Sequence, residues 1–111
     1  MVTRESLRSS KRRPTHPGAI LREDILSELK LSQTALAKRL GVSRRTISQI
    51  VNEQRPITAD MAIRLSRFLG TTPDSWLSMQ QAVDIWDTEH SKQANYARIK
   101  PLKDSELQLA I

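Results

Sequence analysis

The 111-residue chain contains no cysteine, which excludes a disulfide framework and a thiolate zinc site and makes a reducing cytoplasm its simplest compartment. Aromatic residues account for only 4% of the sequence, and glycine and proline are few. Leucine, isoleucine and alanine are frequent instead, and they favour helices packed on helices over a β-sandwich or barrel. We therefore expect one small all-α domain.

Long apolar runs and catalytic motifs are also missing. No stretch approaches the roughly 18 apolar residues that cross a bilayer, so no membrane partner is expected. There is no phosphate-binding glycine loop and no G-x-S-x-G or cysteine nucleophile. His16 and His90 lack a neighbouring metal ligand, and the adjacent Glu23 and Asp24 would diverge on a helix, whereas an acid/base pair must converge. These absences predict a protein that is not an enzyme and that uses no metal or cofactor.

Positive charge dominates the chain, because 18 Lys and Arg residues outweigh 12 Asp and Glu to give a formal net charge of +6. This balance indicates a polyanionic partner, most commonly nucleic acid, although it also fits a surface merely solvated by cations. Residues 1–14 combine many cations with almost nothing apolar, which is typical of a flexible basic arm. We divide the chain into this arm, a domain over residues 15–93 and a tail over residues 94–111.

Cap signals and helical periodicity predict five helices in the domain. Pro17 suits the first position of the first helix, in which Leu21, Ile25 and Leu29 recur every four residues as one buried stripe. The later helices have typical end residues, which are Ser or Thr at the N-cap (Ser32, Ser43, Thr58 and Thr72) and Gly after the last turn (Gly41 and Gly70). Beyond the domain the period breaks, and a short strand, a docked tail and a disordered end all remain open.

The second and third predicted helices are short and closely joined, which is the pattern of a helix-turn-helix. Each would be marginal alone, so the two must pack on each other. Ala37 is small where they cross, Gly41 supplies the positive φ of the turn, and Val42 plugs the turn into the core. Ile47 and Ile50 anchor the second helix from behind, which leaves its polar residues free to contact DNA.

Those polar residues have the chemistry of DNA recognition. Arg can donate two hydrogen bonds to guanine and Gln two to adenine, while a helix N-terminus presents N–H groups to phosphate. We predict base contacts from Arg44, Arg45, Thr46 and Gln49. We predict contacts with the DNA backbone from Gln33, Ser43, Ser48, Asn52 and Arg55. The alternative is an ordinary helical hairpin with a solvated surface.

Two of these residues, Arg44 and Arg45, would lie in the first turn of a helix, where the partial positive charge of the helix disfavours cations. The cost is about 0.3 to 1 kcal/mol for each exposed cation. A groove lined with guanine acceptors and phosphates would offset it, so the pair is well placed for recognition and poorly placed for an isolated helix.

The last predicted helix has more apolar surface than a small core needs. Its stripe comprises Trp76, Met79, Val83 and Trp86. Packing on the fourth helix accounts for Trp76 and Val83, whereas Trp86 and Ile85 near the helix end favour dimerisation, because aromatic residues anchor interfaces. A homodimer would supply the symmetry for a palindromic operator with two half-sites.

The run QTALAKRLGVSRRTISQIVNEQRPIT resembles the helix-turn-helix of the Cro/phage-repressor superfamily. Over about residues 15–90, the motifs HPG, RRTI, NEQRPIT and WLSMQ resemble HigA-type antitoxins of bacterial toxin–antitoxin modules. The resemblance implies a dimeric, lambda-repressor-like domain of five helices that represses its own operon and neutralises a HigB-type toxin, an mRNA-cleaving nuclease. It also implies phosphate contacts for Gln33 and Arg55, and base contacts for Arg44, Arg45, Thr46 and Gln49.

Acidic residues gather on the last helix while most of the chain is basic. They are Asp74, Asp84, Asp87 and Glu89. Such a run fits either a solvated face or a surface that meets a basic toxin. The sequence thus predicts a cytoplasmic repressor and antitoxin, with a free-standing helix-turn-helix regulator and a helical protein-interaction module as the alternatives.

Overall fold

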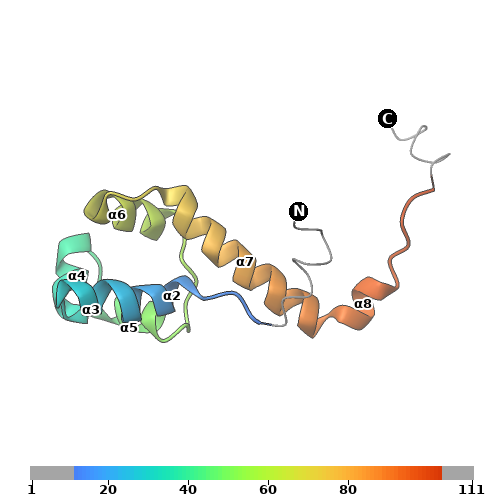
Figure 1. Cartoon of the computed structure of the whole chain (residues 1–111), viewed down its shortest axis with the longest axis horizontal. Coiled ribbons are helices and arrows are strands. Elements are labelled where there is room, and N and C mark those ends of the chain that lie inside the picture. Colours follow the sequence, from blue (N-terminus) through green and yellow to red (C-terminus); the bar gives the residue numbers. More distant parts are fainter. Residues whose placement is uncertain (1–11, 104–111) are drawn as a thin grey trace.

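The computed structural model describes residues 12–103, and every regular element in that range is a helix (Figure 1). The elements are α2 (Pro17–Ile20), the π-helical turn η1 (Leu21–Ile25), α3 (Leu26–Leu29), α4 (Gln33–Leu40), α5 (Arg44–Val51), α6 (Ala59–Leu69), α7 (Pro73–Ser91) and α8 (Gln93–Ala97). Because α2, η1 and α3 follow one another directly, they form one helical segment. The predicted all-α fold with five main helices is confirmed, and the short α8 is an addition to it.

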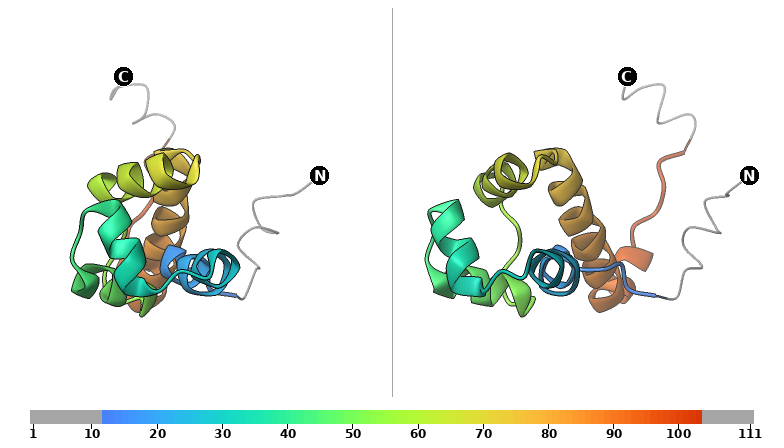
Figure 2. Two further views of the ribbon diagram at one scale, coloured as in Figure 1. Left: turned by 90° about the vertical axis from the view of Figure 1, so that its left-hand side faces the viewer. Right: turned by 60° about the vertical axis from the view of Figure 1, so that its left-hand side comes forward.

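The helices up to α6 gather at one end of the molecule, and α7 runs away from them with α8 beyond its far end (Figures 1 and 2). α4 packs against both α5 and α6, while α2 contacts both α5 and α7. The core between them includes Leu36, Ile47, Ile50 and Leu65, none of which is exposed to solvent. Trp76 of α7 is buried against the same cluster, as its place in the apolar stripe predicts.

Side-chain caps set the helix beginnings at the predicted residues. The hydroxyl oxygens accept backbone N–H groups as follows: Ser32 from Ala35 at 3.0 Å, Ser43 from Thr46 at 3.1 Å, Thr58 from Met61 at 3.3 Å and Thr72 from Ser75 at 3.2 Å. Each such cap contributes about 1 kcal/mol to helix stability. Gly41 and Gly70 follow α4 and α6 with φ of 72° and 73°, a left-handed conformation that glycine adopts without steric cost.

The predicted stripe of the first helix is confirmed at Leu21 and at Ile25, which is half-buried against the core, but it is wrong at Leu29. Leu21 is fully buried, but Leu29 is 49% exposed, and Leu26 replaces it in the core with 9% exposure. The reason is η1, in which the Leu26 N–H bonds to the Leu21 carbonyl, five residues back. A π-helical turn contains one more residue than an α-helical turn. The next leucine in the core after Leu21 is therefore five residues on, at Leu26.

Gly18 marks the closest approach between α2 and α5. A Cβ atom built on Gly18 would lie 1.8 Å from the Ile50 carbonyl oxygen, which is far inside contact distance. The absence of a side chain therefore lets α2 lie directly against the backbone of α5. This contact sets the position of the second helix of the helix-turn-helix.

Candidate nucleic-acid interface

The helix-turn-helix consists of α4, a turn at Gly41 and α5, and its apolar contacts are those expected from the sequence. Ala37 is buried where α4 crosses its neighbours, and Val42 is half-buried against the core. Ile47 and Ile50 are completely buried on the inner side of α5. The opposite face of α5 therefore stays open to a ligand.

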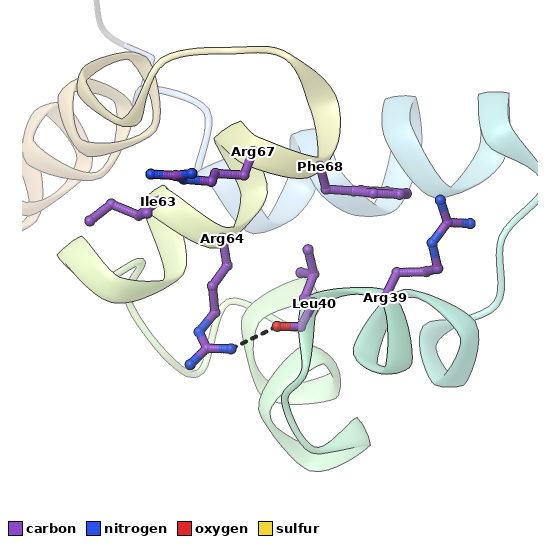
Figure 3. A pocket seen from close by; sticks show the side chains of 6 residues that line it. All are labelled: Arg39, Leu40, Ile63, Arg64, Arg67 and Phe68. Atoms are coloured by element: carbon purple, nitrogen blue, oxygen red, sulfur yellow. Dashed lines mark hydrogen bonds between the residues drawn. The ribbon is translucent and has the colours of Figure 1, made fainter.

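Arg64 of α6 closes the turn of the helix-turn-helix from the side. Its Nη1 donates to the Leu40 carbonyl at 2.8 Å (Figure 3). The same atom donates to the Gly41 carbonyl at 3.4 Å, while Nε donates to Asp60 at 2.9 Å. A cation at the C-terminal end of α4 is favourable because the carbonyls there carry partial negative charge. Sequence reasoning missed this role, although the i, i+4 spacing of Asp60 and Arg64 was visible.

A second arginine on this side, Arg39 of α4, serves packing. Its guanidinium lies 4.8 Å from the centre of the Phe68 ring of α6, within the range of a cation–π contact (Figure 3). Such a contact adds to the apolar packing between α4 and α6. The arginines of this side thus stabilise the scaffold that holds α5.

The predicted base-contacting arginines occupy the first turn of α5. Arg44 and Arg45 are exposed, and within residues 12–103 neither forms an ion pair. Gln49 lies one turn further along α5 and is half-buried. The N-terminal end of α5 therefore presents two positive charges that nothing in the described part of the chain neutralises.

Thr46 differs from the arginines, because its hydroxyl belongs to a local hydrogen-bonded group. The Thr46 and Ser43 hydroxyl oxygens lie 2.9 Å apart, and Arg55 Nη1 donates to Thr46 Oγ1 at 3.4 Å. Ser43 also caps α5. The structure thus brings together one predicted base-contacting residue and two predicted backbone-contacting residues.

The other residues predicted to contact the DNA backbone are spread over both helices. Gln33 occupies the first position of α4, where free N–H groups point outward, and it is half-buried. Asn52 Nδ2 donates to Ser48 Oγ at 3.5 Å, so these two side chains lie together near the C-terminal end of α5.

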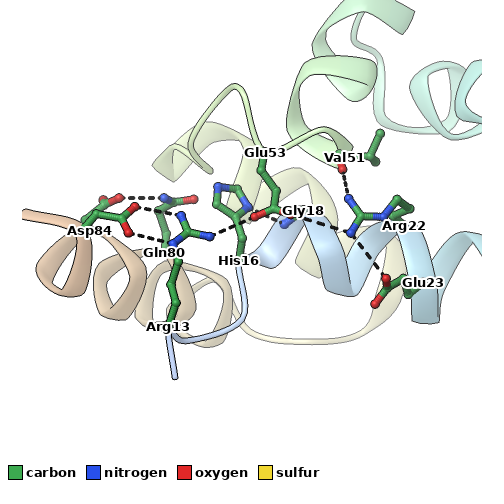
Figure 4. A network of polar contacts seen from close by, with 10 residues as sticks. Arg13, His16, Gly18, Arg22, Glu23, Val51, Glu53, Gln80 and Asp84 are labelled. Carbon is green, nitrogen blue, oxygen red and sulfur yellow. Dashed lines mark hydrogen bonds and ion pairs between the residues drawn. The ribbon is translucent and has the colours of Figure 1, made fainter. Parts of the chain in front are cut away.

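An ion-pair network fixes the C-terminal end of α5, and sequence reasoning did not find it (Figure 4). Arg22 of η1 donates to the Val51 carbonyl and lies 3.7 Å from the Glu53 carboxylate. Glu53, which has the uncommon φ of 60°, also pairs with Arg13 at 3.1 Å. Because these partners are up to 40 residues apart, no local sequence pattern predicts the network.

The network extends from the predicted basic arm to α7. Arg13 donates two parallel hydrogen bonds to Asp87, from Nε at 2.7 Å and from Nη2 at 2.8 Å. The hydrogen bond from Arg13 holds the pKa of Asp87 below its ordinary value, and the same bond raises the pKa of Arg13. The chain is thus anchored at Arg13, and residues 1–11 of the arm lie outside the described residues.

His16 begins the first helical segment as a neutral cap. Its Nδ1 accepts the Gly18 N–H at 2.9 Å, and the residue is buried. Burial lowers the pKa of His16, chiefly because a charged imidazole would lose its hydration. The prediction that this histidine caps or packs at the first helix is confirmed.

The far half of α7 exposes apolar side chains. Ile85 is 50% exposed, and the half-buried Trp86 stacks on His90 with ring centres 3.6 Å apart. Nearer the core, Gln80 links α7 to the loop after α5, because its Oε1 accepts the Ile57 N–H at 2.8 Å and its Nε2 donates to Asp84 at 2.9 Å. The end of α7 beyond this link offers apolar surface to another molecule.

Neither a membrane span nor a metal cluster is found in the part of the chain that the structure describes. None of the helices between residues 12 and 103 combines the length and apolar character needed to cross a bilayer. Over the same range, no three residues among His, Asp and Glu converge as metal ligands would.

These features define a helix-turn-helix DNA-binding protein. They are a short capped helix anchored in the core, a tight turn before it, and a pair of arginines at its N-terminus whose charges are uncompensated. A family model described as helix-turn-helix matches residues 21–76. Antitoxin HigA-1 of Vibrio cholerae is 41% identical over 96 residues, which cover 86% of this chain and 90% of that protein. The chain belongs to the HigA antitoxin family.

Further relatives agree with this assignment. An uncharacterized HTH-type transcriptional regulator of Haemophilus influenzae is 45% identical over 92 residues, covering 81% of this chain and 86% of that protein. The structure of the Pseudomonas aeruginosa antitoxin HigA with the higBA promoter superposes with a TM-score of 0.79 at 41% identity. That match covers 82% of this chain and all of the Pseudomonas chain.

Proposed function

We propose that this protein is a cytoplasmic antitoxin that represses its own operon. A homodimer binds a palindromic operator in double-stranded DNA, and the same protein neutralises a HigB-type mRNA-cleaving toxin. The observation that carries the proposal is the pair of exposed arginines at the N-terminus of α5, which have no ion-pair partner within residues 12–103. DNA supplies the guanine acceptors and phosphates that compensate them.

The operator contacts follow from the position of each side chain on α4 and α5. Arg44, Arg45 and Gln49 on the open side of α5 reach base edges in the major groove. Gln33 at the start of α4 presents its N–H group and side chain to a phosphate. Arg55, in the loop after α5, is the further cation of this surface.

Dimerisation is assigned to the far end of α7. Ile85 is half exposed there, and Trp86 lies beside it as an aromatic anchor. Two copies joined at this end place two α5 helices on one duplex, with about 34 to 36 Å between half-sites on the same face. Sedimentation equilibrium of the wild-type chain and of an Ile85→Lys variant tests this assignment, because the variant is expected to be monomeric.

Toxin binding is assigned to the acidic side of α7. Asp87 already accepts a bidentate arginine, Arg13, which is the kind of cation that a basic toxin would offer. Charge reversal of Asp84 and Asp87 is expected to weaken toxin binding. Unchanged toxin affinity in that variant would remove this surface from the proposal.

The proposal as a whole is tested by expressing the chain together with the product of the gene beside its own. The expected result is a co-purifying complex without mRNA-cleaving activity, together with binding of the chain to the DNA upstream of both genes. An Arg44→Ala variant is the control, because it should bind the operator more weakly and keep neutralisation.

A second candidate function is a free-standing transcriptional regulator. It is favoured by the Haemophilus relative, which is described only as a regulator. Operator binding without any co-purifying toxin would support this second function. The two candidates share the same α5 surface and differ in whether α7 also binds a toxin.

A further inference from the structure

The hydroxyl groups at the N-terminus of α5 form a defined chain with Arg55. Ser43 Oγ accepts the Thr46 N–H at 3.1 Å, the Ser43 and Thr46 hydroxyl oxygens lie 2.9 Å apart, and Arg55 Nη1 donates to Thr46 Oγ1 at 3.4 Å. This hydrogen-bonded group of Ser43, Thr46 and Arg55 lies directly beside Arg44 and Arg45. It is at the end of α5 that enters the major groove in the proposed function.

Counting hydrogen-bond donors and acceptors shows what the Ser43 and Thr46 hydroxyl groups can offer to DNA. A hydroxyl has one proton to donate and two lone pairs to accept with. One proton is used between Ser43 and Thr46, one Ser43 lone pair is used by the cap, and one Thr46 lone pair is used by Arg55. Whichever hydroxyl donates to the other, one oxygen is left with a free proton and no free lone pair. The second oxygen is left with one free lone pair and no proton.

Arg55 is the residue that limits the two hydroxyl groups to one donor and one acceptor, whichever hydroxyl donates to the other. Without its hydrogen bond, Thr46 keeps an extra lone pair and can present a donor or an acceptor to the same base. With the bond in place, the two hydroxyls are one donor and one acceptor, 2.9 Å apart. Arg55 therefore acts on specificity through another side chain, as well as through its own charge.

We propose that Arg55 is a positioning residue for base recognition, and that the Ser43–Thr46 hydroxyl pair reads adenine. Within a single base, only adenine presents an acceptor, N7, next to a donor, the N6 amino group, in the major groove. Guanine presents two acceptors, while cytosine offers a donor and thymine an acceptor with a methyl group. The inference rests on the proposed function, because it requires that α5 enters the major groove of an operator.

The experiment begins with an operator selected by the wild-type full-length chain from random duplex DNA. Every operator position is then substituted in turn, and dissociation constants are measured by fluorescence anisotropy at one fixed salt concentration. The variants are Thr46→Val, Thr46→Ser, Arg55→Ala and the Thr46→Val/Arg55→Ala double variant. Circular dichroism spectra confirm that each variant is folded, and Asn52→Ala is the matched control from the same helix end.

The wild-type chain is expected to prefer adenine at one position per half-site. This preference should fall at least about fivefold in Thr46→Val and in Arg55→Ala, because a bidentate base contact discriminates by about 1 to 3 kcal/mol. The double variant should lose no more preference than either single variant, because both changes disable the same contact. Thr46→Ser should retain the preference, and Asn52→Ala should weaken all sequences evenly. Replacing the adenine by 7-deazaadenine should reproduce the loss in the wild-type chain.

Different failures have different meanings. If Arg55→Ala weakens binding evenly at every operator position, Arg55 contacts phosphate only and the inference is overturned, while the proposed function stands. The same holds if the preferred base at the affected position is not adenine. If the wild-type chain selects no sequence from the random duplexes, the proposed function itself fails.

Discussion

Replacing Gly18 by alanine tests the packing that positions the recognition helix α5. The added Cβ would lie 1.8 Å from the Ile50 carbonyl oxygen and 2.9 Å from its carbon, and both are backbone atoms that no rotamer change can move. Real Cβ contacts are essentially never shorter than 3.0 Å, so α2 and α5 must separate by more than about 1 Å. The substitution therefore displaces the recognition helix and does not merely fill space.

The size of the effect can be worked out from opposing terms. Overpacking of this kind costs about 1 to 3 kcal/mol or more. Alanine in a helical backbone returns about 0.4 to 1 kcal/mol by restricting the unfolded chain. The net expectation is a loss of about 1 to 2 kcal/mol in the free energy of unfolding, which corresponds to a fall in melting temperature of about 4 to 16 °C for a domain of this size.

Urea unfolding followed by circular dichroism measures the stability change, and fluorescence anisotropy with the selected operator measures the functional change. The control is Gly70→Ala, because Gly70 has a φ of 73° and no atom within 4 Å of a Cβ built there. The control should cost about 1 kcal/mol through backbone strain and should leave operator affinity intact. If Gly18→Ala is as stable as the wild type and binds the operator equally well, the described contact between α2 and α5 is wrong.

Further predictions concern base recognition, the pH dependence of stability and the ion pair between Arg13 and Asp87. Arg44→Ala should weaken operator binding and relax base preference at one position per half-site, by about 1 to 3 kcal/mol of discrimination. Binding to base-substituted duplexes measures this preference. A uniform loss of affinity for all duplexes would mean that Arg44 contacts phosphate. Because the folded state lowers the pKa of His16, its stabilising contribution should be complete above the unfolded value of about 6.5 and should decline as pH falls below it. Urea unfolding between pH 7 and pH 5 checks this, and a His16→Asn variant that keeps a cap acceptor should show a flatter profile over that range. Asp87→Asn, which breaks the exposed pair with Arg13, should cost at most about 1 kcal/mol in chemical denaturation, and a larger loss would mean that this ion pair is structurally essential.

Much of the fold follows from local sequence signals, because helix ends depend on residues close in sequence. Ser32, Ser43, Thr58 and Thr72 cap the helices as predicted, since a hydroxyl needs only to reach an N–H three residues ahead. The buried face of α5 was equally predictable, because its apolar residues repeat with the helical period.

The error at Leu29 in the predicted stripe of the first helix had a different cause. The spacing of Leu21, Ile25 and Leu29 fits an α-helix, but tertiary packing selects a π-helical turn that brings Leu26 inward. Periodicity assumes one helix type, so it cannot register a change of helix type within a segment.

The polar scaffold of the site could not be predicted because its partners are distant in sequence. Arg13 and Asp87 are 74 residues apart, and Arg22 meets the C-terminal end of α5 from 29 residues away. From the sequence, Arg13 is predicted to lie in a flexible arm, because residues 1–14 contain almost nothing apolar. The roles of Arg44 and Arg45 remain predictions, supported by their exposure at the N-terminus of α5.

The central claim is that Arg44 and Arg45, at the N-terminal end of α5, read guanine in the major groove. The most direct test replaces each guanine of the selected operator by 7-deazaguanine, which keeps Watson–Crick pairing and removes only the N7 acceptor. We predict that one or two replacements per half-site weaken wild-type binding severalfold and leave the binding of an Arg44→Ala/Arg45→Ala variant unchanged. Equal binding of the wild-type chain to every replaced operator would contradict the claim.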